Sequence, residues 1–377
     1  MIRCVPALIA GLVAALSLGA CEGNRADEIV VGEFASLTGG TATFGRSSDA
    51  GVQLAVEEIN AAGGLLGKTL RVVVEDDQSK PEEARTAVLK LLKQDRVVAV
   101  LGEVASSRSL AAAPECQRAG VPMISPASTN PKVTQVGDHI FRVCFIDPFQ
   151  GSTMAKFAMK TLGAKTAAIL RDVKNDYSVG LADFFRDEFL REGGKILTDV
   201  SYSEGDIDFK AQLTAIRAVR PEVVFVPGYY TEVGLIARQA RELGIAVPLL
   251  GGDGWDSPRT VEIGGAAVDG CYFSNHYAAD DPTEAVQSFI EKYRRKHFEV
   301  PDAMAVLGYD AAQVLADAIR RAGTTEGAKL RDAIAATRDF PGISGKITID
   351  EQRNARKSLV VLKIDGGKVK FFQKVEP

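Results

Sequence analysis

The chain carries the segment GEVASS at residues 102–107 and the segment SPASTNP at residues 125–131. Each segment comes directly after a short apolar run that is typical of a buried strand. In an open α/β sheet, ligands bind outside the carboxyl ends of the strands, where loop amides and hydroxyls converge. The two loops together therefore predict a cradle for a small polar group, most simply a carboxylate. The alternative is that their Ser and Thr residues only cap the helices that follow.

Apolar segments alternate with helical periodicity on both sides of these loops. This alternation predicts parallel sheets covered by helices on both faces. The expected strands are 28–35, 70–75, 97–101 and 121–124, then 167–170, 196–202, 223–226 and 249–250, with a hairpin over 359–372. The expected helices are 48–62, 81–93, 110–119, 179–192, 209–219, 232–243, 283–297, 311–321 and 328–336. The predicted fold class is α/β, with two doubly wound lobes.

The composition agrees with two globular domains. The chain has 377 residues, of which 46% are hydrophobic, and this length exceeds what one ordinary core supports. The formal charge of −4 provides no basic surface for nucleic acid.

The first twenty residues have the pattern of a secretory leader. One early positive charge is followed by an apolar run over 5–18, and LGAC at residues 18–21 matches a lipoprotein cleavage site. We expect residues 1–20 to be a signal peptide, Cys21 to carry the lipid and residues 21–26 to form a tether. The protein would then lie in the periplasm or cell envelope, anchored by lipid. An ordinary secretory leader with an incidental Cys is the alternative.

Three further cysteines follow the leader. An odd count in an oxidising compartment suggests one disulfide and one buried thiol. Cys116 and Cys144 both fall in the early domain and form the expected pair, whereas Cys271 is expected to be a small core residue.

Motifs for catalysis or cofactors are missing from the sequence. The Cys and His spacings do not suit a metal. GGLLGKT at 63–69 has one residue too few for a phosphate-binding loop and leads into a strand instead of a helix. No nucleophile elbow or metalloprotease motif is present. We therefore expect no cofactor, no metal and no enzyme.

Four motifs in order carry a resemblance to a known family. They are VGEFASLTG at 31–39, EINAAGG at 58–64, EDD at 75–77 and ISPASTNP at 124–131. The chain from about Glu28 onward resembles the leucine/isoleucine/valine-binding proteins of ABC importers, which are type I periplasmic binding proteins. The resemblance implies two lobes joined by three crossovers near Asp147, His276 and Lys357. Lobe 1 would comprise 27–147 plus 276–357, and lobe 2 would comprise 148–275 plus 358–377.

The resemblance also implies how an amino acid is held. Ser106, Ala127 and Thr129, with Ser128 in the same loop, match the positions that grip the ligand α-carboxylate. Asp253 matches the acidic residue that takes the α-ammonium. Hydrogen bonds to charged groups are worth about 1.5–3 kcal/mol each, which is enough for micromolar binding after ordering costs. The alternative for Asp253 is that its Asp-Gly pair simply makes a turn.

Three aromatic residues match positions that cover the ligand in this family. Tyr177 and Tyr229 follow predicted strands of the second lobe, and Phe44 matches an aromatic residue on the first. Packing alone is the alternative for each. The chain departs from enteric members at Phe44, which replaces Tyr, and at Asp253, which replaces Glu. It also has Ser79 and Ala105 where those members carry a disulfide. The identity of the ligand side chain stays open.

These observations together predict an extracytoplasmic lipoprotein that captures a branched-chain or other hydrophobic amino acid and delivers it to an ABC permease. We expect a monomer that contacts the membrane only through its lipid. One alternative is a protein of the same fold that binds urea or short amides, or that acts as a ligand sensor. A third is an extracytoplasmic α/β enzyme, whose turnover would be lost on mutation of Asp253 or Tyr177.

Overall fold

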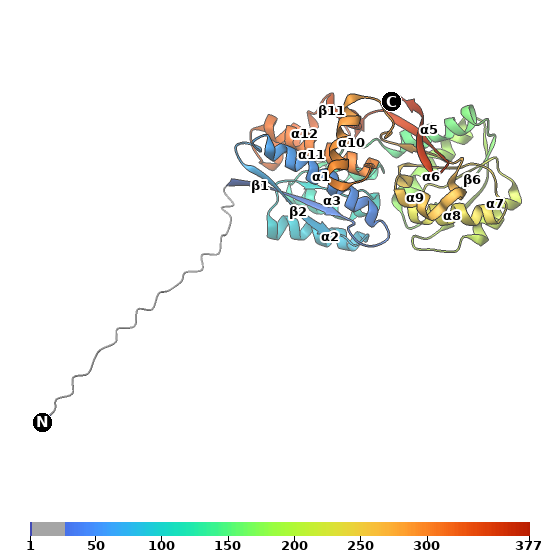
Figure 1. The fold of residues 1–377 in the computed structure, drawn as a ribbon, viewed down its shortest axis with the longest axis horizontal. Helices are drawn as coiled ribbons and strands as arrows, with labels where there is room; N and C mark the ends of the chain where they lie inside the picture. The colour runs from blue at the N-terminus through green and yellow to red at the C-terminus, as the bar shows by residue number, and fades with distance from the viewer. Residues whose placement is uncertain (2–26) are drawn as a thin grey trace.

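The computed structural model describes Met1 and residues 27–377, which form two lobes lying side by side (Figure 1). The expected signal peptide, the tether and the lipidation of Cys21 lie outside the described residues. Among the helices of the described part, none is long and apolar enough to cross a membrane.

The first lobe is built on a five-stranded parallel sheet with the order β2-β1-β3-β4-β5. β1 lies between β2 and β3, and its apolar side chains, including Val31 and Phe34, are buried. The strands are β1 (Glu28–Ala35), β2 (Thr69–Asp76), β3 (Val100–Leu101), β4 (Met123–Ser125) and β5 (Ile140–Arg142).

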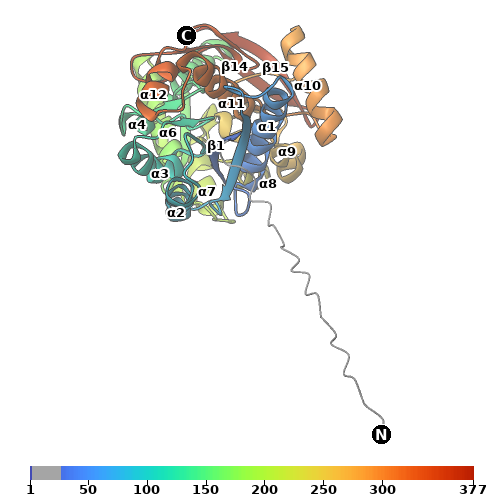
Figure 2. The same cartoon turned by 90° about the vertical axis from the view of Figure 1, so that its left-hand side faces the viewer.

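Helices cover both faces of this sheet (Figure 2). α1 and α11 pack closely, since a Cβ at Gly51 would lie 1.9 Å from the backbone oxygen of Ala305. The helices are α1 (Ala42–Ala61), α2 (Pro81–Lys90) with a π-helical turn (Leu91–Asp95), α3 (Ser106–Ala119), α4 (Lys132–Gln135), α10 (Glu284–His297), α11 (Ala303–Ala322) and α12 (Gly327–Ala335). A small sheet follows, with β11 (Phe340–Gly342), β12 (Gly345–Ile349) and β13 (Ala355–Arg356).

The second lobe has a seven-stranded sheet with the order β15-β14-β10-β9-β8-β6-β7, in which β14 and β15 run antiparallel to their neighbours. Its strands are β6 (Thr166–Asp172), β7 (Lys195–Tyr202), β8 (Val223–Phe225), β9 (Leu249–Gly251), β10 (Tyr272–Asn275), β14 (Leu359–Asp365) and β15 (Lys368–Val375). Its helices are α5 (Asp147–Lys156) with a π-helical turn (Phe157–Thr161), α6 (Asp176–Arg191), α7 (Lys210–Val219), α8 (Tyr230–Glu242), η4 (Asp253–Trp255), α9 (Pro258–Gly264) and η5 (Gly265–Val268).

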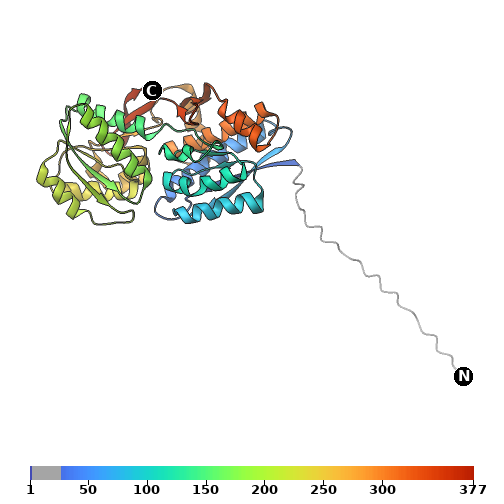
Figure 3. The same ribbon diagram turned by 180° about the vertical axis from the view of Figure 1, so that it is seen from behind.

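The chain passes between the two large sheets after β5, after β10 and after β13. These passages lie along one edge of the molecule (Figure 3). The predicted fold class, two parallel-sheet lobes, is confirmed. The exact division of the chain into lobes stays a prediction.

Several helices begin earlier than the sequence pattern predicted, and the difference is largest for α1 and α11. The helix expected at 48 starts at Ala42, because the Gly- and Thr-rich segment before it places Phe44 in the core. The helix expected at 311 starts at Ala303, where the side chain of Asp302 accepts a hydrogen bond from the Ala305 amide. α5, β10 and the small sheet were not predicted.

The predicted pairing of Cys116 with Cys144 is wrong, because both thiols are free. Cys116 packs in the apolar cluster under α2 and α3, whereas Cys144 belongs to a different cluster of the core. The Cys144 thiol lies 3.4 Å from the backbone oxygen of Ser128, to which it donates a hydrogen bond. Cys271 is a buried core residue, as expected.

Candidate functional site

The loops at 102–107 and 125–131 lie together at the carboxyl ends of β3 and β4. The backbone oxygen of Glu103 accepts hydrogen bonds from Ser125 Oγ at 2.7 Å and Ser128 Oγ at 2.8 Å. The Asn130 amide donates to Ser106 Oγ at 3.2 Å. The capping alternative does not explain the first loop, because the residue that caps α3 is Ala105, which makes no side-chain cap.

A buried Arg holds the second loop from below. Arg142, on β5, donates through its guanidinium to the backbone oxygens of Ser128 and Asn130, the latter at 2.8 Å. These hydrogen bonds fix the backbone on either side of Thr129. Arg142 on β5 therefore sets the direction in which the Thr129 side chain points.

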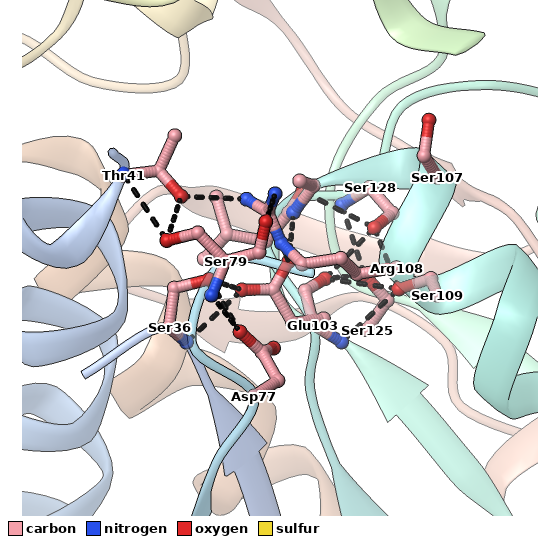
Figure 4. A network of polar contacts seen from close by, with 12 residues as sticks. Ser36, Thr41, Asp77, Ser79, Glu103, Ser107, Arg108, Ser109, Ser125 and Ser128 are labelled. Carbon is pink, nitrogen blue, oxygen red and sulfur yellow. Dashed lines mark hydrogen bonds and ion pairs between the residues drawn. The ribbon is translucent and has the colours of Figure 1, made fainter. Parts of the chain in front are cut away.

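A polar network lies beside the first loop (Figure 4). The Glu103 carboxylate accepts a hydrogen bond from Arg108 Nε at 3.0 Å, and Ser36 Oγ lies between Glu103 and Asp77, at 2.9 and 2.7 Å. Burial, followed by the charge of Glu103, raises the pKa of Asp77 to about 8. Gly102 is required here, since a Cβ on it would lie 2.2 Å from the backbone oxygen of Phe34. The network therefore fixes the loop without forming a hydrogen bond to the Thr129 hydroxyl.

Two of the predicted ligand-binding residues present buried polar atoms that have no hydrogen-bond partner in the described part of the chain. These atoms are Thr129 Oγ1 and Asp253 Oδ1, and their side chains belong to different lobes. Buried polar groups are nearly always hydrogen-bonded, so such atoms call for a partner. Asp147 lies between the two residues: its amide donates to the Thr129 backbone oxygen at 3.0 Å, and its carboxyl is near Asp253.

The side chain of Asp253 does not take part in the turn that its Asp-Gly pair begins. Asp253 starts η4, and its amide donates to Gln150 Oε1 at 2.8 Å. Its Oδ2 lies 3.0 Å from His276 Nε2, which leaves Oδ1 as the unpartnered oxygen. A turn made by the Asp-Gly pair thus explains the backbone conformation of Asp253 but not the position of its carboxylate.

Burial shifts the pKa values of two groups near Asp253, Asp147 and His276. Burial raises the pKa of the Asp147 carboxyl to about 8. The nearby Thr129 hydroxyl opposes this rise, the charge of Asp253 strengthens it, and the charge of Arg142 opposes it. Burial lowers the pKa of His276 to about 4, against the attraction of Asp253. At neutral pH the imidazole is therefore uncharged and does not neutralise Asp253, so a ligand cation suits the site better than an anion.

The three predicted aromatic residues come together across the lobes. Tyr177 stacks on Tyr229 at a centroid distance of 5.3 Å, and Phe44 meets Tyr229 edge-on at 5.5 Å. The Tyr177 hydroxyl accepts a hydrogen bond from the Gly254 amide at 3.1 Å. Tyr230, which sequence reasoning missed, also contacts Phe44 and accepts a bond from the Thr43 amide. These rings form an apolar wall beside the polar groups.

Not every predicted residue offers a free side chain. The Ser128 hydroxyl lies 2.8 Å from both Ser109 Oγ and the backbone oxygen of Glu103, so it serves the loop itself. Ala127 is buried and can contribute only backbone groups. Asp147, Gln150 and His276 were not predicted as site residues, although two of them fall at predicted crossovers; only their position in the fold reveals them.

The lobes also touch directly at the ends of two helices. Ser107, at the start of α3, lies 2.8 Å from Asp176 Oδ2, and its oxygen accepts a bond from the Asp176 amide at 2.9 Å. Asn130 Nδ2 donates to the Asp176 backbone oxygen at 2.8 Å. In the described residues, no group of three or more His, Cys, Asp and Glu could hold a metal ion.

Comparison with known proteins places this arrangement in a family. Residues 28–368 match the family model described as "Periplasmic binding protein". An "Amino acid binding protein" of Pseudomonas aeruginosa is 34% identical over 80% of this chain and 81% of its own length.

Two solved structures share the fold over nearly the whole chain. A leucine-binding protein of Thermotoga maritima has a TM-score of 0.90 and 43% identity, and the match covers 93% of this chain and 99% of that one. A branched-chain amino acid transporter substrate-binding protein of Streptococcus pneumoniae, in complex with isoleucine, has a TM-score of 0.88 and 34% identity, with 93% and 100% covered. The chain therefore belongs to the branched-chain amino-acid-binding family of type I periplasmic binding proteins, whose members are transporter components and not enzymes.

Proposed function

We propose that this protein binds a hydrophobic L-amino acid between its lobes and delivers it to an ABC permease. The amino acids we favour are the branched-chain ones. The relatives support this choice, because the Streptococcus pneumoniae protein was solved with isoleucine and the Thermotoga maritima protein is a leucine-binding protein.

The observation that carries the proposal is the pair of unpartnered buried atoms, Thr129 Oγ1 and Asp253 Oδ1. A buried carboxylate oxygen without a partner is costly, and a ligand ammonium would remove that cost. Thr129 Oγ1 can accept from the same ammonium or donate to the ligand carboxylate. The backbone of Ala127 and the hydroxyl of Ser106 would complete the carboxylate site.

The apolar wall supports a hydrophobic ligand side chain. Phe44, Tyr177 and Tyr229 are all buried, and they approach from both lobes. Contacts made by both lobes exist only when the lobes are together, so ligand binding would favour the closed arrangement.

We also propose that the mature protein is held to the membrane by a lipid on Cys21 and acts as a monomer. The support is the LGAC motif at 18–21. Metabolic labelling with a fatty acid, compared between the natural chain and a Cys21→Ala variant, tests the anchor. The label should appear only on the natural chain.

A thermal-shift screen tests the binding function most simply. The purified protein is heated with each of the twenty amino acids and with urea, short amides and small carboxylates. A ligand at 100 times its Kd stabilises by about 2.7 kcal/mol, so a true ligand gives a clear shift. We expect shifts from aliphatic L-amino acids. Shifts from amides or carboxylates alone would contradict the proposal.

A further inference from the structure

His276 occupies a fixed place where the chain leaves the second sheet. It follows β10 directly and is 3% exposed. Its ring stacks on Phe145 at a centroid distance of 3.8 Å and an interplanar angle of 21°, and its amide donates to Asn275 Oδ1 at 2.8 Å. The backbone bond and the stacked ring leave the imidazole little freedom to turn.

The imidazole meets one oxygen of Asp253. His276 Nε2 lies 3.0 Å from Asp253 Oδ2, and the two side chains are 0% and 4% exposed. An ionised carboxylate can only accept hydrogen bonds, so His276 Nε2 carries the hydrogen and donates it to Asp253 Oδ2. His276 Nδ1 has no hydrogen-bond partner in the described residues, which agrees with a neutral ring whose second nitrogen bears no proton.

We infer that His276 is a positioning residue: its neutral Nε2–H holds Asp253 Oδ2 and turns Oδ1 toward the ligand ammonium. The inference rests on the proposed function. Because Asp253 has one methylene fewer than Glu, its carboxylate depends more on a fixed neighbour for its direction. A neutral donor orients the carboxylate without cancelling its charge, which a protonated imidazole would do.

Other ionisable groups also face this pair of side chains. Lys357, near β14, acts on His276 by its charge. The groups that interact electrostatically with Asp253 are Asp147 on α5, Tyr177 on α6, Cys144 after β5 and Asp256 after η4. These groups are present in every variant below, so differences between variants report on the His276–Asp253 pair.

The test is a double-mutant cycle in the purified protein, with L-leucine as the probe ligand measured by calorimetry. His276→Phe keeps a ring that can stack on Phe145 and removes the donor, whereas His276→Gln keeps an N–H donor at a similar reach. We expect the Phe variant to bind leucine at least tenfold more weakly and the Gln variant to recover most of that loss. In an Asp253→Asn background, His276→Phe should cause little further loss.

A control at a second buried histidine separates positioning from a general effect of replacing a His by Phe. The matched control is His139→Phe, since His139 is also a largely buried His beside a carboxylate, Asp138, and lies away from this site. That control should bind leucine normally.

Additive losses in the cycle, or a Gln variant that recovers none of the affinity lost in the Phe variant, would overturn the inference and leave His276 with a packing role alone. If the Phe variant does not fold, His276→Gln and His276→Asn replace it, because the shorter Asn cannot reach Asp253. Equal affinities of these two variants would then refute the inference. Failure of the natural protein to bind any amino acid would instead refute the proposed function.

Discussion

At the scale of single residues, the site depends on which polar atoms are already satisfied. Ser128 looks like Thr129 in the sequence, yet its hydroxyl is used within the loop, whereas Thr129 Oγ1 is left without a partner among the described residues. The sequence predicts a binding site in this loop. It could not predict which hydroxyl is available, since that depends on Ser109 and Glu103 packing beneath it.

Thr129→Val removes the hydroxyl and preserves the shape of the side chain. We expect leucine binding to weaken at least tenfold, about 1.4 kcal/mol. The melting temperature without ligand should fall only slightly, because the hydroxyl loses a single contact, with the Asp147 carboxyl. Calorimetry and thermal melting measure both quantities. The control is Thr86→Val on the surface of α2; if it weakens binding equally, the assignment of Thr129 is wrong.

Asp77 provides a stability prediction that is independent of the ligand. Its pKa is raised from the ordinary 3.8 to about 8, so its contribution to stability is present at low pH and is lost as the pH rises to 8. Asp77→Asn removes that cost. The melting temperature of the variant should exceed that of the natural protein by about 2 °C or more at pH 8.5. The gain should shrink toward pH 4, and a gain independent of pH would contradict the assigned cause.

At the scale of elements, strands and helices with clear periodicity were well predicted. The expected strand at 28–35 coincides with β1, and the expected hairpin at 359–372 corresponds to β14 and β15. α5 was missed because its start, DPFQG, contains Pro and Gly, and its helical character depends on packing against α6. The disulfide prediction failed because proximity in sequence order does not say which cluster of the core a side chain joins.

The free thiols can be counted chemically. In protein beginning at Glu22, Cys116, Cys144 and Cys271 are the cysteines present. Denaturation without reductant, followed by alkylation and mass spectrometry, should add three labels. Addition of a single label would show that two of the thiols are paired and would contradict the structure.

The contact between α3 and α6 offers a test of lobe closure. Ser107→Ala removes both hydrogen bonds that Ser107 makes with Asp176 across the lobes. Two such bonds contribute about 1–3 kcal/mol to the closed form, so leucine affinity should fall about tenfold. Most of the change should appear as faster dissociation in stopped-flow measurements.

The matched control for this variant is Ser152→Ala on α5. In the described residues, the Ser152 hydroxyl donates to the Phe149 backbone oxygen of its own helix at 3.1 Å. This substitution should leave both affinity and dissociation rate unchanged. If Ser107→Ala also has no effect, the interlobe bonds do not contribute to ligand retention.

At the scale of the whole molecule, the two lobes bring together residues that are far apart in sequence. Phe44 and Tyr229 touch, and the loop with Thr129 and the η4 turn with Asp253 both lie beside Asp147. The family resemblance predicted these partners, whereas Gln150 and His276 emerged only from the fold. Their roles depend on the position of the passages between the lobes, which periodicity alone does not give.

In the proposed complex, Asp253 holds the ligand ammonium while the ligand side chain lies against the apolar wall of Phe44, Tyr177 and Tyr229. The most direct measurement compares the affinities of L-leucine and 4-methylpentanoate, the same molecule without its amino group, by calorimetry. We expect leucine to bind with a Kd in the micromolar range or below and 4-methylpentanoate to bind at least a hundredfold more weakly. Equal affinities, or tighter binding of the carboxylate, would contradict it.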